Sequence, residues 1–177
     1  MSAVPVAGSF AVPALKLRRM VALSPTWKQA IAGLPSKPEA PDRVWLKNAL
    51  GIEPRPLAVV SLGDEHSHYL IAGGDHNHLR PRGSLVLYLS IDTPPEFYED
   101  AVSAEFFAGS FFGQVIDDVV AISAADDPDS EDGTSHLSIV GTRLQDFDET
   151  AYQDANSLSR FYWAAYAIAW GDGDGGA

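Results

Sequence analysis

Four of the five histidines lie within residues 66–83, "HSHYLIAGGDHNHLRPRG", as two His-x-His pairs. His66 and His68 would point to one face of an extended segment, and His76 with His78 could do the same across a turn. Imidazole nitrogens placed in this way bind zinc and similar divalent ions, and a nearby Asp or Glu can complete the set of ligands. The pattern is therefore compatible with a small metal-dependent enzyme.

The surroundings of these histidines favour a loop between strands over a metal site. The segment is rich in Gly, Asp, Asn and Ser, as turns are, and His-x-His is short enough to occur by chance. The chain lacks a Gly-x-Ser-x-Gly elbow, a phosphate-binding glycine loop and a His-Glu-x-x-His motif. It has no cysteine, which excludes disulfides, thiolate metal sites and cysteine nucleophiles. We therefore expect no catalytic residue, no metal and no cofactor, with the metal enzyme as the alternative.

Length and composition predict one globular domain. The chain has 177 residues, of which 46% are hydrophobic and 20% charged. No apolar run is evidently long enough to span a bilayer, and the first 17 residues lack the basic start and cleavage site of a signal peptide. We expect a protein with no membrane association.

The charges are distributed unevenly along the chain. The net charge is −12, but residues 1–55 carry eight Lys/Arg against three Asp/Glu (+5), and residues 56–177 carry four against twenty-one (−17). The total argues against general nucleic-acid binding, which needs clustered basic residues. Two interpretations remain open: a solvated acidic surface beside a basic N-terminal helix, or copies that stack with opposite charges facing.

Apolar residues recur at helical spacing in three segments. Ser24 followed by Pro25 is typical of a helix start, so a short helix is expected from there to Gly33. The longest helix should place one apolar face on a sheet. The predicted helices are 14–23, 25–33 and 98–124, and the apolar positions of the last are Val102, Phe106, Phe107, Phe111, Val115, Val119 and Ile122.

Four segments have the alternation or the short apolar run of a strand. In residues 84–92, Leu85, Leu87, Leu89 and Ile91 share one face, with Val86 and Tyr88 on the other. The last segment is apolar on both faces, so we expect cover from both sides. The predicted strands are 57–63, 84–92, 136–144 and 160–171, with a minor strand near 69–72 and a polar loop at 145–157.

These elements predict an α+β fold: a four-stranded, mainly antiparallel sheet packed by one long helix, with short N-terminal helices. We expect a flexible arm at residues 1–13, a single domain at 14–171 and a disordered tail at 172–177.

The order of these elements resembles tail terminator proteins of long-tailed bacteriophages. The phrases that carry the resemblance are "RPLAVVSLGDE", "LRPRGSLVLYLSIDTPPE", "EFFAGSFFGQVIDDV" and "FYWAAYAIAWGD", which follow basic helices. The resemblance covers Leu15 to Gly171. It implies a non-catalytic α+β subunit without a cofactor, forming a ring, usually a hexamer. Such a ring caps the tail tube and joins it to the head connector, so the location would be the head-proximal tail of the virion, after assembly in the host cytoplasm. Another head-tail connector ring is a further alternative.

A ring subunit must offer two different surfaces to its neighbours. The basic helices and the doubly apolar last strand are the candidates, and an acidic channel would let DNA pass without specific binding. The N-terminal arm and the His-rich segment have no counterpart in the family. The expected subunit or tube contacts are Arg18, Arg19, Trp27, Trp163, Tyr166 and Trp170.

Overall fold

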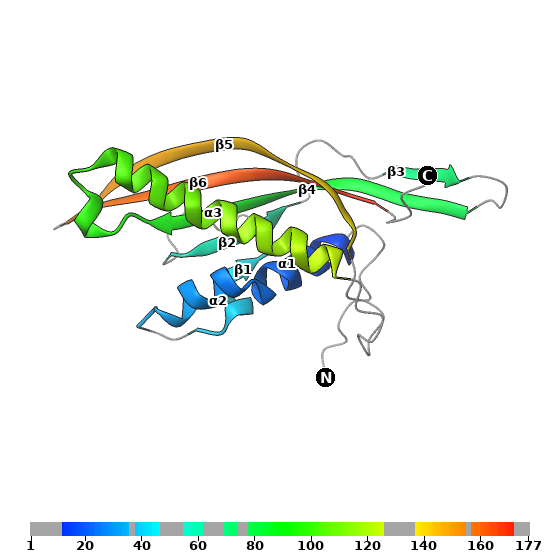
Figure 1. Cartoon of the computed structure of the whole chain (residues 1–177), viewed down its shortest axis with the longest axis horizontal. Coiled ribbons are helices and arrows are strands. Elements are labelled where there is room, and N and C mark those ends of the chain that lie inside the picture. Colours follow the sequence, from blue (N-terminus) through cyan, green and yellow to red (C-terminus); the bar gives the residue numbers. More distant parts are fainter. Residues whose placement is uncertain are drawn as a thin grey trace.

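The chain folds as an α+β domain in which helices cover one face of a curved sheet (Figure 1). The computed structural model describes residues 12–35, 38–46, 55–61, 69–73, 78–125, 137–154 and 157–171. The helices are α1 (Val12–Leu23), α2 (Pro25–Ala32) and α3 (Ala101–Ala124), with 3-10 turns η1 (Ala40–Arg43) and η3 (Pro95–Phe97). The strands are β1 (Val44–Trp45), β2 (Leu57–Ser61), β3 (Tyr69–Gly73), β4 (His78–Asp92), β5 (Ile139–Asp154) and β6 (Ser157–Trp170).

The sheet is larger than the four strands predicted. Its order is β1-β2-β4-β6-β5, and β3 pairs with β4 away from this path. The predicted antiparallel set corresponds to β2, β4, β6 and β5. The addition of β1, which runs parallel to β2, makes the sheet mixed. A two-residue strand leaves too short a pattern to be recognised in a sequence.

Strand β4 organises the sheet because it pairs with three others. Its second half lies between β2 and β6, where Leu87 pairs with Val60 on one side and Tyr166 on the other. Its first half pairs with β3, and together they extend beyond the helical layer (Figure 1). The predicted alternation holds: Leu85, Leu87 and Leu89 are fully buried, whereas the residues between them are half-buried. Ile91, predicted on the same face, packs against the core but is only half-buried.

The prediction of a polar loop at residues 145–157 is wrong. Strand β5 continues to Asp154, and β6 begins at Ser157, so the two form one long antiparallel hairpin. Strand β5 lies at the sheet edge, and its side chains from Val140 to Asp146 are exposed. An exposed edge strand can be polar on both faces, so its composition resembles that of a loop.

The N-terminal helices begin and end close to the predicted positions. Helix α1 starts at Val12, two residues earlier than expected, so the end of the predicted arm is helical; residues 1–11 and 172–177 lie outside the described residues. Helix α2 has the predicted cap, because the Ser24 hydroxyl accepts from the Trp27 backbone N–H at 3.1 Å with Pro25 in the first turn.

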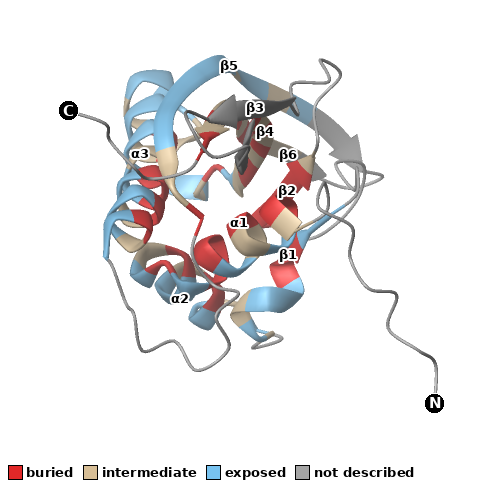
Figure 2. Cartoon of the chain, turned by 90° about the vertical axis from the view of Figure 1, so that its right-hand side faces the viewer, coloured by how far each residue is buried: buried red, intermediate tan, exposed pale blue. Residues whose placement is uncertain are grey.

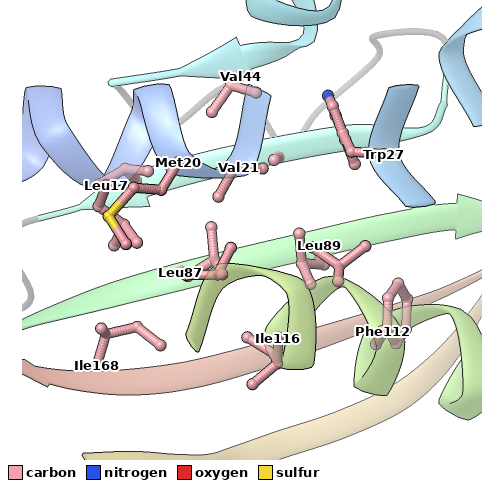
Figure 3. Packing of buried hydrophobic residues seen from close by; sticks show 14 of the residues in the cluster. Leu17, Met20, Val21, Trp27, Val44, Leu87, Leu89, Phe112, Ile116 and Ile168 are labelled. Carbon is pink, nitrogen blue, oxygen red and sulfur yellow. The ribbon is translucent and has the colours of Figure 1, made fainter. Parts of the chain in front are cut away.

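The core lies between the helices and the facing side of the sheet (Figure 3). Figure 2 shows buried residues on the inner sides of α1 and α3 and exposed residues on the outer side of α3. The largest fully buried side chains include Trp27, Phe112, Leu17, Ile31, Leu87 and Ile168. Helices and strands distant in sequence thus share one hydrophobic core.

Helix α3 does not bury every apolar residue that was assigned to its inner face. Phe111, Val115 and Val119 are buried as predicted, but Val102 is 65% exposed and Phe106 75%. Successive helical residues are rotated by about 100°, so Phe106 lies roughly opposite its buried neighbours at positions 104 and 108. The outer side of α3 therefore carries an apolar surface of its own.

Candidate assembly surfaces

Arg18 fixes the first surface by joining α1 to the segment that follows α2. Its Nε donates to the Val44 carbonyl at 2.7 Å, and its Nη2 donates to the Pro41 carbonyl at 3.2 Å. A second link comes from Trp27, whose indole Nε1 donates to the Ala40 carbonyl at 3.1 Å. Arg18 is thus primarily a structural residue that holds η1 against α1.

This arrangement leaves a groove of about 340 Å³ between α1, the start of α2 and η1. Leu15 and Leu23 contribute apolar walls and are 40% and 43% exposed. Arg19 and Lys28 add positive charge, and residues 12–32 contain four basic and no acidic residues. We call this the basic groove; its lining is Leu15, Arg18, Arg19, Ala22, Leu23, Lys28, Ala40 and Pro41.

Asp118 anchors the helices that carry this groove to α3. Its Oδ2 accepts from the Ser24 hydroxyl at 2.6 Å and from the Thr26 backbone N–H at 3.0 Å. Burial raises the pKa of Asp118, but the hydrogen bonds from Ser24 and Thr26 outweigh it, so the pKa lies below its ordinary value. The carboxylate is therefore held ionised at the first turn of α2, where the helix dipole also favours a negative charge.

The second surface is the outer side of α3. Val102 and Phe106 are its large apolar residues, Glu105 lies exposed beside them, and Gly109 and Gly113 continue the same side. A Cβ added at either glycine would meet no atom within 4 Å. Glu105 is the charged residue of this side; of the other two acidic residues of α3, Asp117 is exposed further along the helix and Asp118 contacts α2. We call this side the acidic ridge, defined by Val102, Glu105, Phe106, Gly109 and Gly113.

By length and composition alone, α3 is long and hydrophobic enough to cross a membrane. The sequence-based expectation that no apolar segment has this length is therefore wrong. Eight residues of α3 are buried in the domain, and 39% of its most apolar stretch is buried. The large apolar side chains of this helix that the fold leaves exposed are Val102, Phe106 and, to a smaller extent, Val120.

The structure divides the predicted contact residues into several environments. Trp27 is 0% exposed and Trp170 6%, so both side chains belong to the core and cannot form the surface expected of them. Trp163 is half-buried on the sheet face opposite the helices. Tyr166 is half-buried beside the core, and burial, followed by the charge of Asp117, raises its pKa. Of the predicted contacts, Arg19 lines the basic groove together with Arg18.

Sequence reasoning did not anticipate Arg55, which joins three strands on the face opposite the helices. Its Nε donates to the Ser90 hydroxyl at 2.9 Å, and its guanidinium carbon lies 3.4 Å from the centre of the Phe161 ring. Its Nη1 is 3.5 Å from Asp92 Oδ1. Burial raises the pKa of Asp92, and the charge of Arg55 opposes this effect. The geometry is that of a clamp between β2, β4 and β6, and it also covers part of Phe161.

The proposed metal ligands are not assembled in the part of the chain that the structure describes. His66, His68 and His76 lie outside the described residues, and His78 is the first residue of β4, paired with Gly73. Among the described side chains, no three His, Cys, Asp or Glu residues lie close enough to hold a metal. The absence of a metal site at the histidines stays a prediction.

No family model matches this chain. No curated protein matches it either. Inference about function therefore comes from the two surfaces, the charge distribution and the order of elements.

Proposed function

We propose that the protein is a structural virion subunit that forms a ring at the head-proximal end of a phage tail. The ring caps the tail tube, stops its growth and joins the tail to the head connector. The partners are further copies of this chain, expected as a hexamer, the tail tube protein and a head completion protein. The proposal assigns no catalysis and no cofactor.

The observation that carries this proposal is the presence of two unlike surfaces on one domain. The basic groove and the acidic ridge each combine exposed apolar side chains with charge of one sign. Closed rings are built from contacts in which one surface of a subunit meets a different surface of the next. A domain with two such surfaces is suited to ring formation, whereas an isolated monomer has no need of them.

The edge strand supports the second part of the proposal, passage of DNA. Asp146 and Asp148 are exposed on the sheet face opposite the helices, and Glu149 is exposed on the other face. Acidic groups in a channel repel phosphates, so DNA can slide without being bound. We assign Asp146 and Asp148 to the channel side of the ring, and the basic helices to contacts with subunits or with the tube.

The test uses assembled particles, because rings of this kind can require their template in order to close. Phage that lack the protein should have over-long tails or tails that fail to join heads, and the wild-type gene supplied in trans should restore them. Imaging should place a ring at the head-proximal tip of normal tails. Normal tails and full infectivity without the protein would refute the function. A ring lumen lined by Lys16, Arg18 and Arg19 would refute the charge assignment alone.

The same images distinguish the related alternative, another connector ring. A terminator contacts the last ring of the tail tube, and tails made without it are wrong in length. A head completion protein remains with the head, and tails made without it have normal length but stay unattached. Normal-length free tails would therefore replace the terminator role with the connector role.

A further inference from the structure

The two surfaces lie on different sides of the domain and differ in form. The groove is concave, between α1 and η1, whereas the ridge is the convex outer side of α3. Figure 2 shows the exposed side of α3 at the left edge of the molecule, with α1 at the centre and α2 below. A single copy therefore cannot bury its own ridge in its own groove.

We propose that the acidic ridge of one copy docks into the basic groove of the next. Phe106 and Val102 of the first copy lie against Leu15 and Leu23 of the second. The closing of a ring by repetition of this contact rests on the proposed function. The contact between two copies follows from the shape and charge of the two surfaces.

Charge is the reason for choosing a second copy over a different partner. The groove is lined by Arg18, Arg19 and Lys28, and Glu105 lies exposed on the ridge, so the two surfaces carry opposite charges in the head-to-tail arrangement. Two grooves facing each other, or two ridges, would place like charges together. Glu105 adjoins Phe106 on the ridge, and Lys28 lines the groove, so the apolar contact and the opposite charges lie together.

The dimensions of the two surfaces are also compatible. The part of the ridge from Val102 to Gly109 spans about 11 Å along α3, and the α1 wall of the groove, from Leu15 to Leu23, spans about 12 Å. Gly109 and Gly113 have no side chain and face open space. A neighbouring helix can therefore approach the α3 backbone closely, within the usual distance of packed helices.

Single cysteines test the contact directly, since the chain has none of its own. Phe106→Cys and Leu15→Cys proteins are mixed at about millimolar concentration and treated with a short bismaleimide. Val140→Cys is the matched control, because Val140 is 64% exposed but lies near the other end of α3. The Phe106/Leu15 mixture should give at least about tenfold more cross-linked dimer than the Val140/Leu15 mixture, because docking holds the thiols at high effective concentration.

A second experiment tests the direction of the contact. Phe106→Asp removes the ridge and Leu15→Asp removes the groove, so each variant alone should be monomeric in analytical ultracentrifugation. Their mixture retains one intact ridge and one intact groove and should give a dimer that grows no further. Both changed side chains are substantially exposed, and thermal melts should show that the variants are folded.

Three results would overturn the proposal: cross-linking no better than the Val140 control, wild-type protein monomeric at millimolar concentration, or no dimer in the mixture. Preferential linkage of Phe106→Cys to itself would indicate a two-fold contact between ridges and would also overturn it. These outcomes are separable from those for the proposed function, which depends on tail length and head joining. If rings form on normal tails but Phe106 and Leu15 do not cross-link, the proposed function stands and the proposed interface is wrong.

Discussion

Replacement of Asp118 by Asn should loosen the attachment of α2 to α3. In the native protein one carboxylate oxygen accepts from the Ser24 hydroxyl at 2.6 Å and from the Thr26 N–H at 3.0 Å. Hydrogen bonds to a charged group contribute about 1.5–3 kcal/mol each. Asn keeps an acceptor oxygen and loses the charge, so we expect a loss of about 1–2 kcal/mol in the free energy of unfolding at pH 7. Ala, which loses both bonds, should cost about 2–4 kcal/mol, less than the sum for two buried bonds because Asp118 is only half-buried and solvent screens its charge.

The pKa of Asp118 determines how the stability difference between wild type and Asp118→Asn changes with pH. The pKa of Asp118 in the folded protein is lowered, since the hydrogen bonds outweigh the effect of burial. Such a group stabilises the fold fully above its unfolded pKa of about 3.9, and this stabilisation is lost as the pH falls through the folded pKa. The difference between wild type and Asp118→Asn should therefore be full at pH 7 and should shrink below about pH 4.

Urea unfolding at pH 7 and pH 3 measures both quantities, and Asp117 provides the matched control. It is the adjacent carboxylate on the same helix, exposed to solvent. Asp117→Asn should change stability by less than about 0.5 kcal/mol, as surface substitutions do. Equal effects of the two substitutions, or an effect of Asp118→Asn that does not decrease in acid, would refute the reasoning.

The remaining predictions concern α3 and the histidines. Phe112→Ala should lower the free energy of unfolding by about 3–5 kcal/mol because its ring is fully buried, whereas Phe106→Ala should change it by less than about 0.5 kcal/mol; chemical denaturation compares the two. Gly109→Ala should raise the melting temperature, because Ala is favoured over Gly by about 1 kcal/mol in an exposed helix and the added Cβ meets no atom; a lower melting temperature would contradict this. Elemental analysis of the purified protein should find no stoichiometric transition metal, and one equivalent of zinc that is lost when His66 and His68 become Ala would overturn this.

The sequence predicted the elements whose inner and outer sides differ most in composition. The alternation in β4 identified Leu85, Leu87 and Leu89 as core because strand side chains point alternately to opposite faces. The Ser24–Pro25 pair identified the start of α2, since its signals are local. In these cases local pattern and tertiary environment agree.

The same reasoning failed where residue type does not reveal environment. Phe106 and Phe112 are chemically identical, and only the rotation of α3 relative to the sheet determines that one is exposed and the other buried. The groove could not be predicted from the sequence either, because it depends on a hydrogen bond between Arg18 and a carbonyl 26 residues away. Trp27 was expected at a subunit or tube contact, yet its side chain lies in the core.

Strand β4 also has a consequence for hydrogen exchange. Residues 83–92 are paired on both sides or lie over the core, whereas residues 78–82 pair with β3 in the ribbon that extends beyond the helices. Two-stranded ribbons are only marginally stable without a packed face. Backbone amides in the first half of β4 should therefore exchange through local opening, and those in the second half only through global unfolding. One continuous strand thus spans two independently opening units, and the boundary between them lies near Gly83.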